Sequence, residues 1–184
     1  ELSGSKKKLE ELSKNLKSKF NIKKGDLSLV VGGPPCQGYS GIGHRRSYKV
    51  DKEKIPSNYL YKEMYKVIEY FDPKAFIFEN VRGLLSARWT KNGAKGEIFK
   101  DVLKQFSKLK NYNYDYSLVQ SKDYGVPQNR PRVLVIGIRK DIKSKISKEE
   151  LFPKKDKSYP HLEELFSDLI DKNYNKDFVT SSYL

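Results

Sequence analysis

The side chain best suited to covalent chemistry is the chain's single cysteine, Cys36. It follows an apolar run, Leu27 to Val31, and a Gly32-Gly33-Pro34-Pro35 corner, a pattern typical of a buried strand that ends in a sharp turn. Two prolines restrict the backbone before the thiol, and the basic pair Arg45-Arg46 could lower the thiol pKa. A lone cysteine is often an inert buried residue, but this position favours a nucleophile.

Glu79 is a second candidate, because it directly follows the apolar run Phe76-Ile77-Phe78. A carboxylate at the end of a buried strand is costly unless it is paired or functional. Glu79 could therefore be the ion-pair partner of an arginine, or an acid that takes part in a reaction.

Arg130 and Arg132 form the third candidate group. They are two residues apart, so an extended segment would place both side chains on one face. Two such guanidinium groups suit the binding of a phosphate or of an electron-rich base edge, although they could also be ordinary surface charges.

Alternating strands and helices should position these residues. Helical spacing of apolar residues predicts helices over 9–20, Tyr59 to Phe71 and Glu97 to Leu109. Strand candidates are Leu27–Val31, Ala75–Phe78, Tyr114–Val119 and Val133–Ile138, and Leu162–Ile170 could form a further short helix. The alternation predicts an open α/β sheet, mostly parallel and with helices on both faces, whose ligands bind beyond the carboxyl ends of the strands. Loops at Pro34-Pro35-Cys36 and Glu79-Asn80-Val81 should then lie side by side.

Composition limits the possible partners and sites. The 184 residues carry a formal net charge of +14, which suits a polyanion such as nucleic acid, although lysine-rich composition alone would give the same excess. Cys36 with only His44 and His161 cannot assemble an ordinary zinc site, so no metal is expected. No apolar run reaches about 18 residues, so no membrane partner is expected either.

Three blocks in this order resemble the cytosine-C5 methyltransferase family. The blocks are Gly33-Pro34-Pro35-Cys36-Gln37-Gly38-Tyr39-Ser40, Phe78-Glu79-Asn80-Val81 and Gln128-Asn129-Arg130-Pro131-Arg132. The resemblance extends from about Leu27 to Arg139. It implies a Rossmann-like methyltransferase sheet, S-adenosylmethionine as cofactor and double-stranded DNA as substrate.

The resemblance also implies a role for individual residues. Cys36 would attack C6 of a cytosine flipped out of the duplex, and Glu79 would bind the ring and protonate N3. Arg130 and, with less support, Arg132 would anchor the target nucleotide and steady Glu79. The cofactor pocket would include Pro35 and Leu60. The residues expected to contact nucleic acid are Gln37, Ser40, Arg45, Arg46 and Gln128.

Other parts of the family pattern are not visible. No glycine-rich cofactor loop precedes Leu27, so the sheet is expected to be incomplete in its N-terminal half. Residues 1–142 would then be the central and C-terminal half of the catalytic domain, and residues 143–184 a linker and the start of a target-recognition region. We expect a fragment, or one subunit of a split enzyme. Its strand at Leu27 to Val31 would be a bare apolar edge that needs a complementary segment, and alone it would aggregate and be weakly active.

Two alternatives to a DNA methyltransferase remain open at this point. One is a tRNA cytosine-C5 methyltransferase, since one branch of the same family keeps these blocks but acts on RNA. The other is a non-catalytic nucleic-acid-binding or assembly subunit. An intracellular prokaryotic protein, associated with restriction and modification, fits the composition and the compact core.

Overall fold

The computed structural model describes residues 6–35 and 52–156, together with residues 164, 166 and 167. The chain divides into two units, which are described separately. The first comprises residues 1–119 and 131–153, and the second comprises residues 120–130 and 154–184. The functional assignment of residues 143–184 to a target-recognition region stays a prediction.

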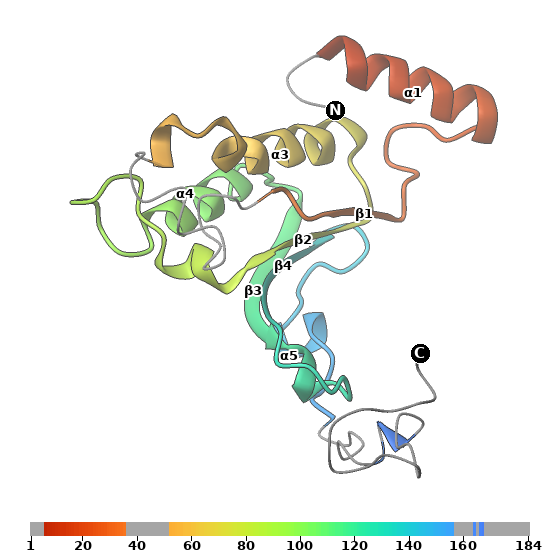
Figure 1. Ribbon diagram of the computed structural model, residues 1–184. Helices are drawn as coiled ribbons and strands as arrows, with labels where there is room; N and C mark the ends of the chain where they lie inside the picture. Colours follow the sequence, from red (N-terminus) through yellow and green to blue (C-terminus); the bar gives the residue numbers. More distant parts are fainter. Residues whose placement is uncertain (1–5, 36–51, 157–163, 165, 168–184) are drawn as a thin grey trace, which may run out of the picture. The chain divides into compact units, whose positions relative to one another are not determined.

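A four-stranded sheet forms the centre of the first unit, in the order β1-β2-β4-β3 (Figure 1). Its strands are β1 (Leu29–Gly32), β2 (Ala75–Val81), β3 (Tyr112–Gln120) and β4 (Pro131–Arg139). β1 pairs with β2 in parallel, with Gly32 opposite Phe78. β2 pairs with β4 in antiparallel fashion, with Val81 opposite Arg132. The expected α/β class is confirmed, and within it the sheet is mixed.

Mixed pairing follows from the connections between the strands. Parallel neighbours need a long crossover, usually a helix, and α3 (Leu60–Phe71) supplies it between β1 and β2. The next crossover contains α4 (Glu97–Phe106) and leads from β2 to β3, which is not the neighbour of β2. The connection from β3 to β4, residues 121–130, contains only the short 3-10 helix η5 (Ser121–Asp123).

The hydrophobic core lies between one face of the sheet and the helices α3 and α4. Alternate residues of β2 and β4 point into it, and the aromatic rings of Phe76 and Phe78 both lie against Phe106 of α4. α3 ends at Asp72, whose left-handed backbone (φ 47°) precedes Pro73. Short 3-10 helices lead into this layer: η2 (Lys52–Lys54), η3 (Pro56–Tyr59) and η4 (Arg82–Ser86).

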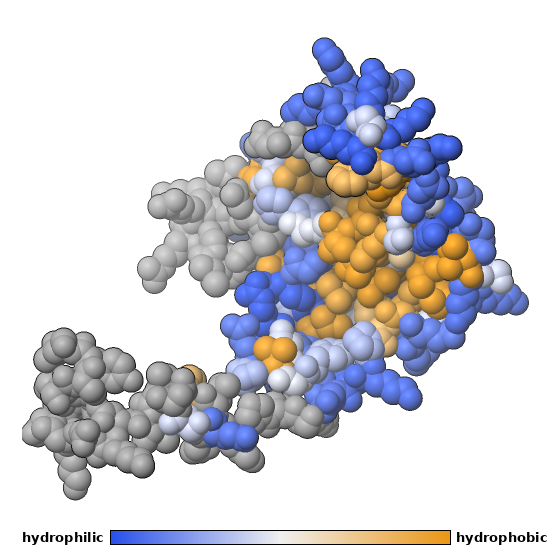
Figure 2. Space-filling view, turned by 90° about the vertical axis from the view of Figure 1, so that its right-hand side faces the viewer, coloured by the Kyte–Doolittle hydropathy of each residue, from blue (hydrophilic) through white to orange (hydrophobic). Residues whose placement is uncertain are grey.

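β1 is an edge strand with exposed apolar side chains, as the sequence predicts. Its residues Leu29 and Val31 are 46% and 63% exposed and lie on the sheet face away from α3 and α4. A view from the β1 side shows a broad apolar area at this part of the surface (Figure 2). The N-terminal helix α1 (Lys6–Phe20) buries only Leu9 fully and contacts α3.

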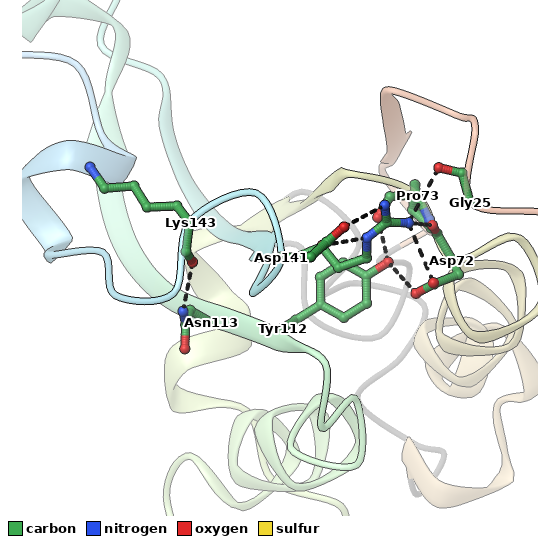
Figure 3. Close-up of polar contacts among 8 residues, drawn as sticks. Gly25, Asp72, Pro73, Tyr112, Asn113, Asp141 and Lys143 are labelled. Carbon is green, nitrogen blue, oxygen red and sulfur yellow. Dashed lines mark hydrogen bonds and ion pairs between the residues drawn. The ribbon is translucent and has the colours of Figure 1, made fainter.

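A cluster of polar contacts ties chain segments together where β2 begins and β4 ends (Figure 3). Arg139 Nη1 donates to the carbonyl oxygens of Asp72 at 2.6 Å and of Gly25 at 3.2 Å. Its Nε and Nη2 donate to the carboxylate of Asp141 at 2.7 and 2.9 Å. The hydroxyl of Tyr112 donates to Asp72 at 3.1 Å and to the Pro73 carbonyl. This network closes the end of the sheet that lies opposite Glu79.

Candidate active site

The turn after β1 and the last residues of β2 meet, as predicted. Because Gly32 is in register with Phe78, the Gly33-Pro34-Pro35 turn runs beside Glu79 and Asn80. The sequence predicts a loop at Glu79-Asn80-Val81, and this is wrong, because β2 continues through Val81 paired with β4. Strand geometry therefore sends the neighbouring side chains Glu79 and Asn80 to opposite faces of the sheet.

Glu79 forms an ion pair with Arg132. Arg132 stands opposite Val81 in β4, which makes it a diagonal neighbour of Glu79 on one sheet face. Its Nε lies 2.5 Å from Glu79 Oε1, and the two side chains are 22% and 37% exposed. Glu79 is therefore reachable from solvent and held by one cation, which is the pairing that makes a carboxylate at this position tolerable.

The turn leaves room for this carboxylate only because residue 33 is a glycine. A Cβ at Gly33 would lie 2.8 Å from Glu79 Oε2, closer than real Cβ contacts come. The backbone of the turn and the carboxylate are thus in direct contact, a close approach that only glycine permits. Sequence reasoning missed this role of Gly33.

Asn80 holds the same turn from the core side. Its side chain is 4% exposed, and its Nδ2 donates to the Pro34 carbonyl at 3.2 Å. Its Oδ1 accepts the backbone N–H of Val81 at 2.9 Å. The sequence analysis gave Asn80 no role, although a polar residue between Glu79 and Val81 at a buried strand end was a usable signal.

Pro35 and Leu60, the predicted cofactor residues, lie at the two elements that flank this turn. Pro35 is exposed after β1, and Leu60 is the half-buried first residue of α3. Pro35 also lines a small cavity of about 10 Å³ that reaches Ser57 and Asn58 in front of α3. The buried Ser57 Oγ has no hydrogen-bond partner among the described residues. An exposed proline and a free hydroxyl suit one wall of a larger binding site, and the cavity itself is only as large as a water molecule.

The remaining predicted site residues are not brought together with Glu79 by the described structure. Gln128 and Arg130 are exposed and belong to the second unit, where the Arg130 carbonyl accepts from the Ser121 hydroxyl at 3.2 Å. In that unit Lys155 also pairs with Asp123 at 2.8 Å. Five further predicted residues lie outside the described residues: Cys36, Gln37, Ser40, Arg45 and Arg46.

The geometry around Glu79 agrees with the comparison to known proteins. The family model for C-5 cytosine-specific DNA methylases matches residues 3–183. The chain belongs to this family. All three sequence blocks quoted above lie within the matched range.

Individual members of the family show the extent of the similarity. Type II methyltransferase M.DdeI of Desulfomicrobium norvegicum is 35% identical over 82% of this chain and 34% of its own length. Type II methyltransferase M.FnuDI of Fusobacterium nucleatum is 36% identical over 77% of this chain and 38% of its own. The chain thus spans about a third of the length of these curated relatives.

A solved structure supports the fold. A putative DNA modification methyltransferase encoded within a prophage of E. coli is 28% identical, with a TM-score of 0.52 over 77% of this chain and 35% of that one. The methyltransferase EhMeth of Entamoeba histolytica, at 20% identity and a TM-score of 0.50, shares the fold. The expected Rossmann-like methyltransferase fold is therefore confirmed for this C-5 methylase chain.

Two negative findings apply to the described residues alone. They contain no group of three or more histidine, cysteine, aspartate or glutamate side chains that could hold a metal ion. No helix among them is long and apolar enough to cross a membrane.

Proposed function

We propose that the protein methylates C5 of cytosine in double-stranded DNA, with S-adenosylmethionine as the methyl donor and Cys36 as the nucleophile. The observation that carries the proposal is the Glu79 carboxylate, paired with Arg132 and in contact with the turn that leads to Cys36. In a C-5 methylase this combination supplies an acid and a thiol to one pyrimidine ring.

The proposed reaction begins with a covalent bond between the Cys36 sulfur and C6 of the cytosine. C5 of cytosine is a weak nucleophile, and addition at C6 makes it reactive by pushing electrons into the ring. Glu79 donates a proton to N3 and so neutralises the charge that develops there. Arg132, at 2.5 Å, then stabilises the carboxylate that the proton leaves behind.

The second half of the reaction restores the aromatic ring. S-adenosylmethionine, when bound, supplies the methyl group that C5 accepts. Loss of the proton from C5 then re-forms the C5–C6 double bond and expels the Cys36 thiolate. Pro35, Leu60 and the hydroxyl of Ser57 are the residues of this chain that would contact the donor.

DNA binding is proposed from charge and from the position of the reacting atoms. C6 of a stacked cytosine cannot be reached inside a duplex, so the base must be extruded at a cost of a few kcal/mol. Phosphate contacts from a chain of net charge +14 can offset that cost. Arg130, Gln128, Gln37, Ser40, Arg45 and Arg46 are proposed to make the nucleic-acid contacts.

We also propose that the open face around β1 is covered by polypeptide beyond these 184 residues, equivalent to the rest of the relatives' length. Leu29 and Val31 are too exposed for a stable free surface, and an uncovered edge strand invites aggregation. The isolated chain should therefore aggregate, and changing Val31 to Lys should make it more soluble. A monomeric, fully active isolated chain would contradict this proposal.

A mechanism-based trap tests the central proposal. Full-length protein incubated with S-adenosylmethionine and duplex DNA containing 5-fluorocytosine should form a stable covalent adduct, because the fluorine cannot leave C5 as a proton does. Mass spectrometry should place the adduct on Cys36, and Cys36→Ala should abolish it. An adduct with tRNA but with no DNA would favour an RNA substrate, and no adduct with either would refute a catalytic role for this chain.

A further inference from the structure

The hydrogen bond from Asn80 to Pro34 joins β2 to the turn at the point where that turn leads to the nucleophile. It spans 46 residues of sequence and lies at the edge of the core, with Asn80 only 4% exposed. A buried amide of this kind is retained only where both its donor and its acceptor are used. Here the acceptor is occupied by the Val81 N–H, which leaves the donor to fix Pro34.

Glu79 and Asn80 thus grip one turn from opposite faces of the sheet. The Glu79 carboxylate lies against Gly33, and the Asn80 amide binds the carbonyl of the next residue, Pro34. Proline fixes φ at positions 34 and 35, so the carbonyl orientation of Pro34 is one of the few freedoms left in the turn. Cys36 follows this carbonyl by two residues in the sequence.

We propose that Asn80 is a positioning residue that sets the approach of the Cys36 thiol through the Pro34 carbonyl. The inference rests on the proposed function, because it assigns Asn80 to the attack of Cys36 on cytosine. Asn80 itself touches neither the base nor the sulfur in this proposal. Its contribution is to hold the turn in one orientation relative to Glu79, so that the acid and the thiol keep a fixed separation.

The surroundings of Asn80 allow a substitution that can be switched by pH. Of the described residues that line the small cavity at Asn80, Tyr61 of α3 is the one with a titratable group. Burial raises the pKa of Tyr61 to about 12, so it stays neutral in the assay range. The charged neighbour along β2, Glu79, points to the other face and is common to wild type and variant.

Asn80→Asp keeps an oxygen for the Val81 N–H but replaces the donor to Pro34 by a second oxygen. An ionised carboxylate cannot donate to the Pro34 carbonyl and repels it, whereas a protonated carboxyl can donate an O–H to it. Burial favours the protonated form of such a group. The variant should therefore regain the bond as the pH falls.

The experiment measures the rate of adduct formation with 5-fluorocytosine DNA by the full-length protein, between pH 8.5 and pH 6. At pH 8.5 we expect Asn80→Asp to be about 10- to 100-fold slower than wild type, the size of effect that a displacement of about 1 Å produces. Wild type should slow at lower pH as the thiolate is lost. The ratio of variant to wild-type rate should therefore rise toward 1 as the pH falls, which a purely structural role for Asn80 would not produce.

Tyr112→Phe is the matched control for lost stability. Tyr112 is also buried and also donates to a carbonyl, that of Pro73, at the opposite end of β2. Its loss should lower the melting temperature but leave a rate ratio near 1 at every pH. If Asn80→Asp is too unstable to purify, Asn80→Ala at a temperature where circular dichroism shows it folded decides the same point.

The outcomes separate the two proposals. Asn80→Asp or Asn80→Ala with a wild-type rate would overturn the positioning role while leaving the proposed function intact. A slow Asn80→Asp variant whose rate ratio does not change with pH would also overturn it. A wild-type protein that forms no adduct would refute the proposed function itself.

Discussion

Adding a single methyl group at Gly33 should separate catalysis from stability in this protein. In Gly33→Ala the new Cβ would lie 2.8 Å from Glu79 Oε2, whereas ordinary contacts begin at 3.4 Å, so the carboxylate must move by about 0.6 Å. Gly33 is not among the residues with positive φ, so the backbone accepts alanine. The Glu79–Arg132 ion pair is partly exposed and is worth at most about 1 kcal/mol of folding free energy.

The expected result is an active-site defect in a stable protein. A displacement of about 1 Å in a catalytic group can cost roughly 100-fold in rate, so 0.6 Å should cost about tenfold or more. The unfolding free energy should change by less than about 1 kcal/mol. Transfer of radiolabelled methyl groups from S-adenosylmethionine to DNA measures the first quantity, and thermal unfolding followed by circular dichroism measures the second, both in full-length protein.

Gly32→Ala provides a control with the same clash on the other side of the sheet. Its Cβ would lie 2.8 Å from Met64 Sδ in the core, far along a flexible side chain and away from the carboxylate. Overpacking there should cost about 1–3 kcal/mol but leave the rate of the folded enzyme unchanged. If both variants lose activity only in proportion to their loss of stability, or if Gly33→Ala is fully active, the contact between the turn and Glu79 has no catalytic importance.

Three further outcomes follow from the same structure. Arg132→Gln should lower the methyl-transfer rate about 10- to 100-fold with less than about 1 kcal/mol lost in stability, because it removes the partly exposed partner of Glu79; an unchanged rate would contradict this role. Gly137→Ala should lower the unfolding free energy by about 1–3 kcal/mol or more in chemical denaturation, because its Cβ would lie 2.2 Å from the fully buried ring of Phe76; normal stability would show that the core can adjust. Because burial raises the pKa of Tyr61 from its ordinary value of 10 to about 12, the unfolded state loses the phenolic proton first, so stability should fall as the pH rises from 10 to 12, and Tyr61→Phe should flatten that decline.

The sequence predicted the elements of this fold better than their ends. The helices α3 and α4 and the strands β2 and β4 were expected from apolar spacing, and the meeting of Pro34 with Asn80 followed from parallel strand ends. The strand β2 nevertheless runs three residues past the predicted Phe78. The pairing of Glu79, Asn80 and Val81 with β4 depends on strand register, which local pattern does not fix.

Side-chain partners across long sequence separations were the least predictable feature. Sequence reasoning assigned the steadying of Glu79 first to Arg130, and Arg132 is the residue that pairs with it in the structure. The choice is made by the diagonal position of Arg132 on β4. Roles for Cys36, Arg130 and the nucleic-acid-binding residues stay predictions, because they depend on the family resemblance rather than on contacts among the described residues.

The guanidinium of Arg139 serves several acceptors at once at the closed end of the sheet, and this has a consequence for how substitutions combine. Its loss would leave the carbonyls of Gly25 and Asp72 and the carboxylate of Asp141 without their shared donor in a single step. Once that donor is gone, altering Asp141 as well removes little more. Epistasis among these positions should therefore be strong, with paired changes costing less than the sum of the single ones.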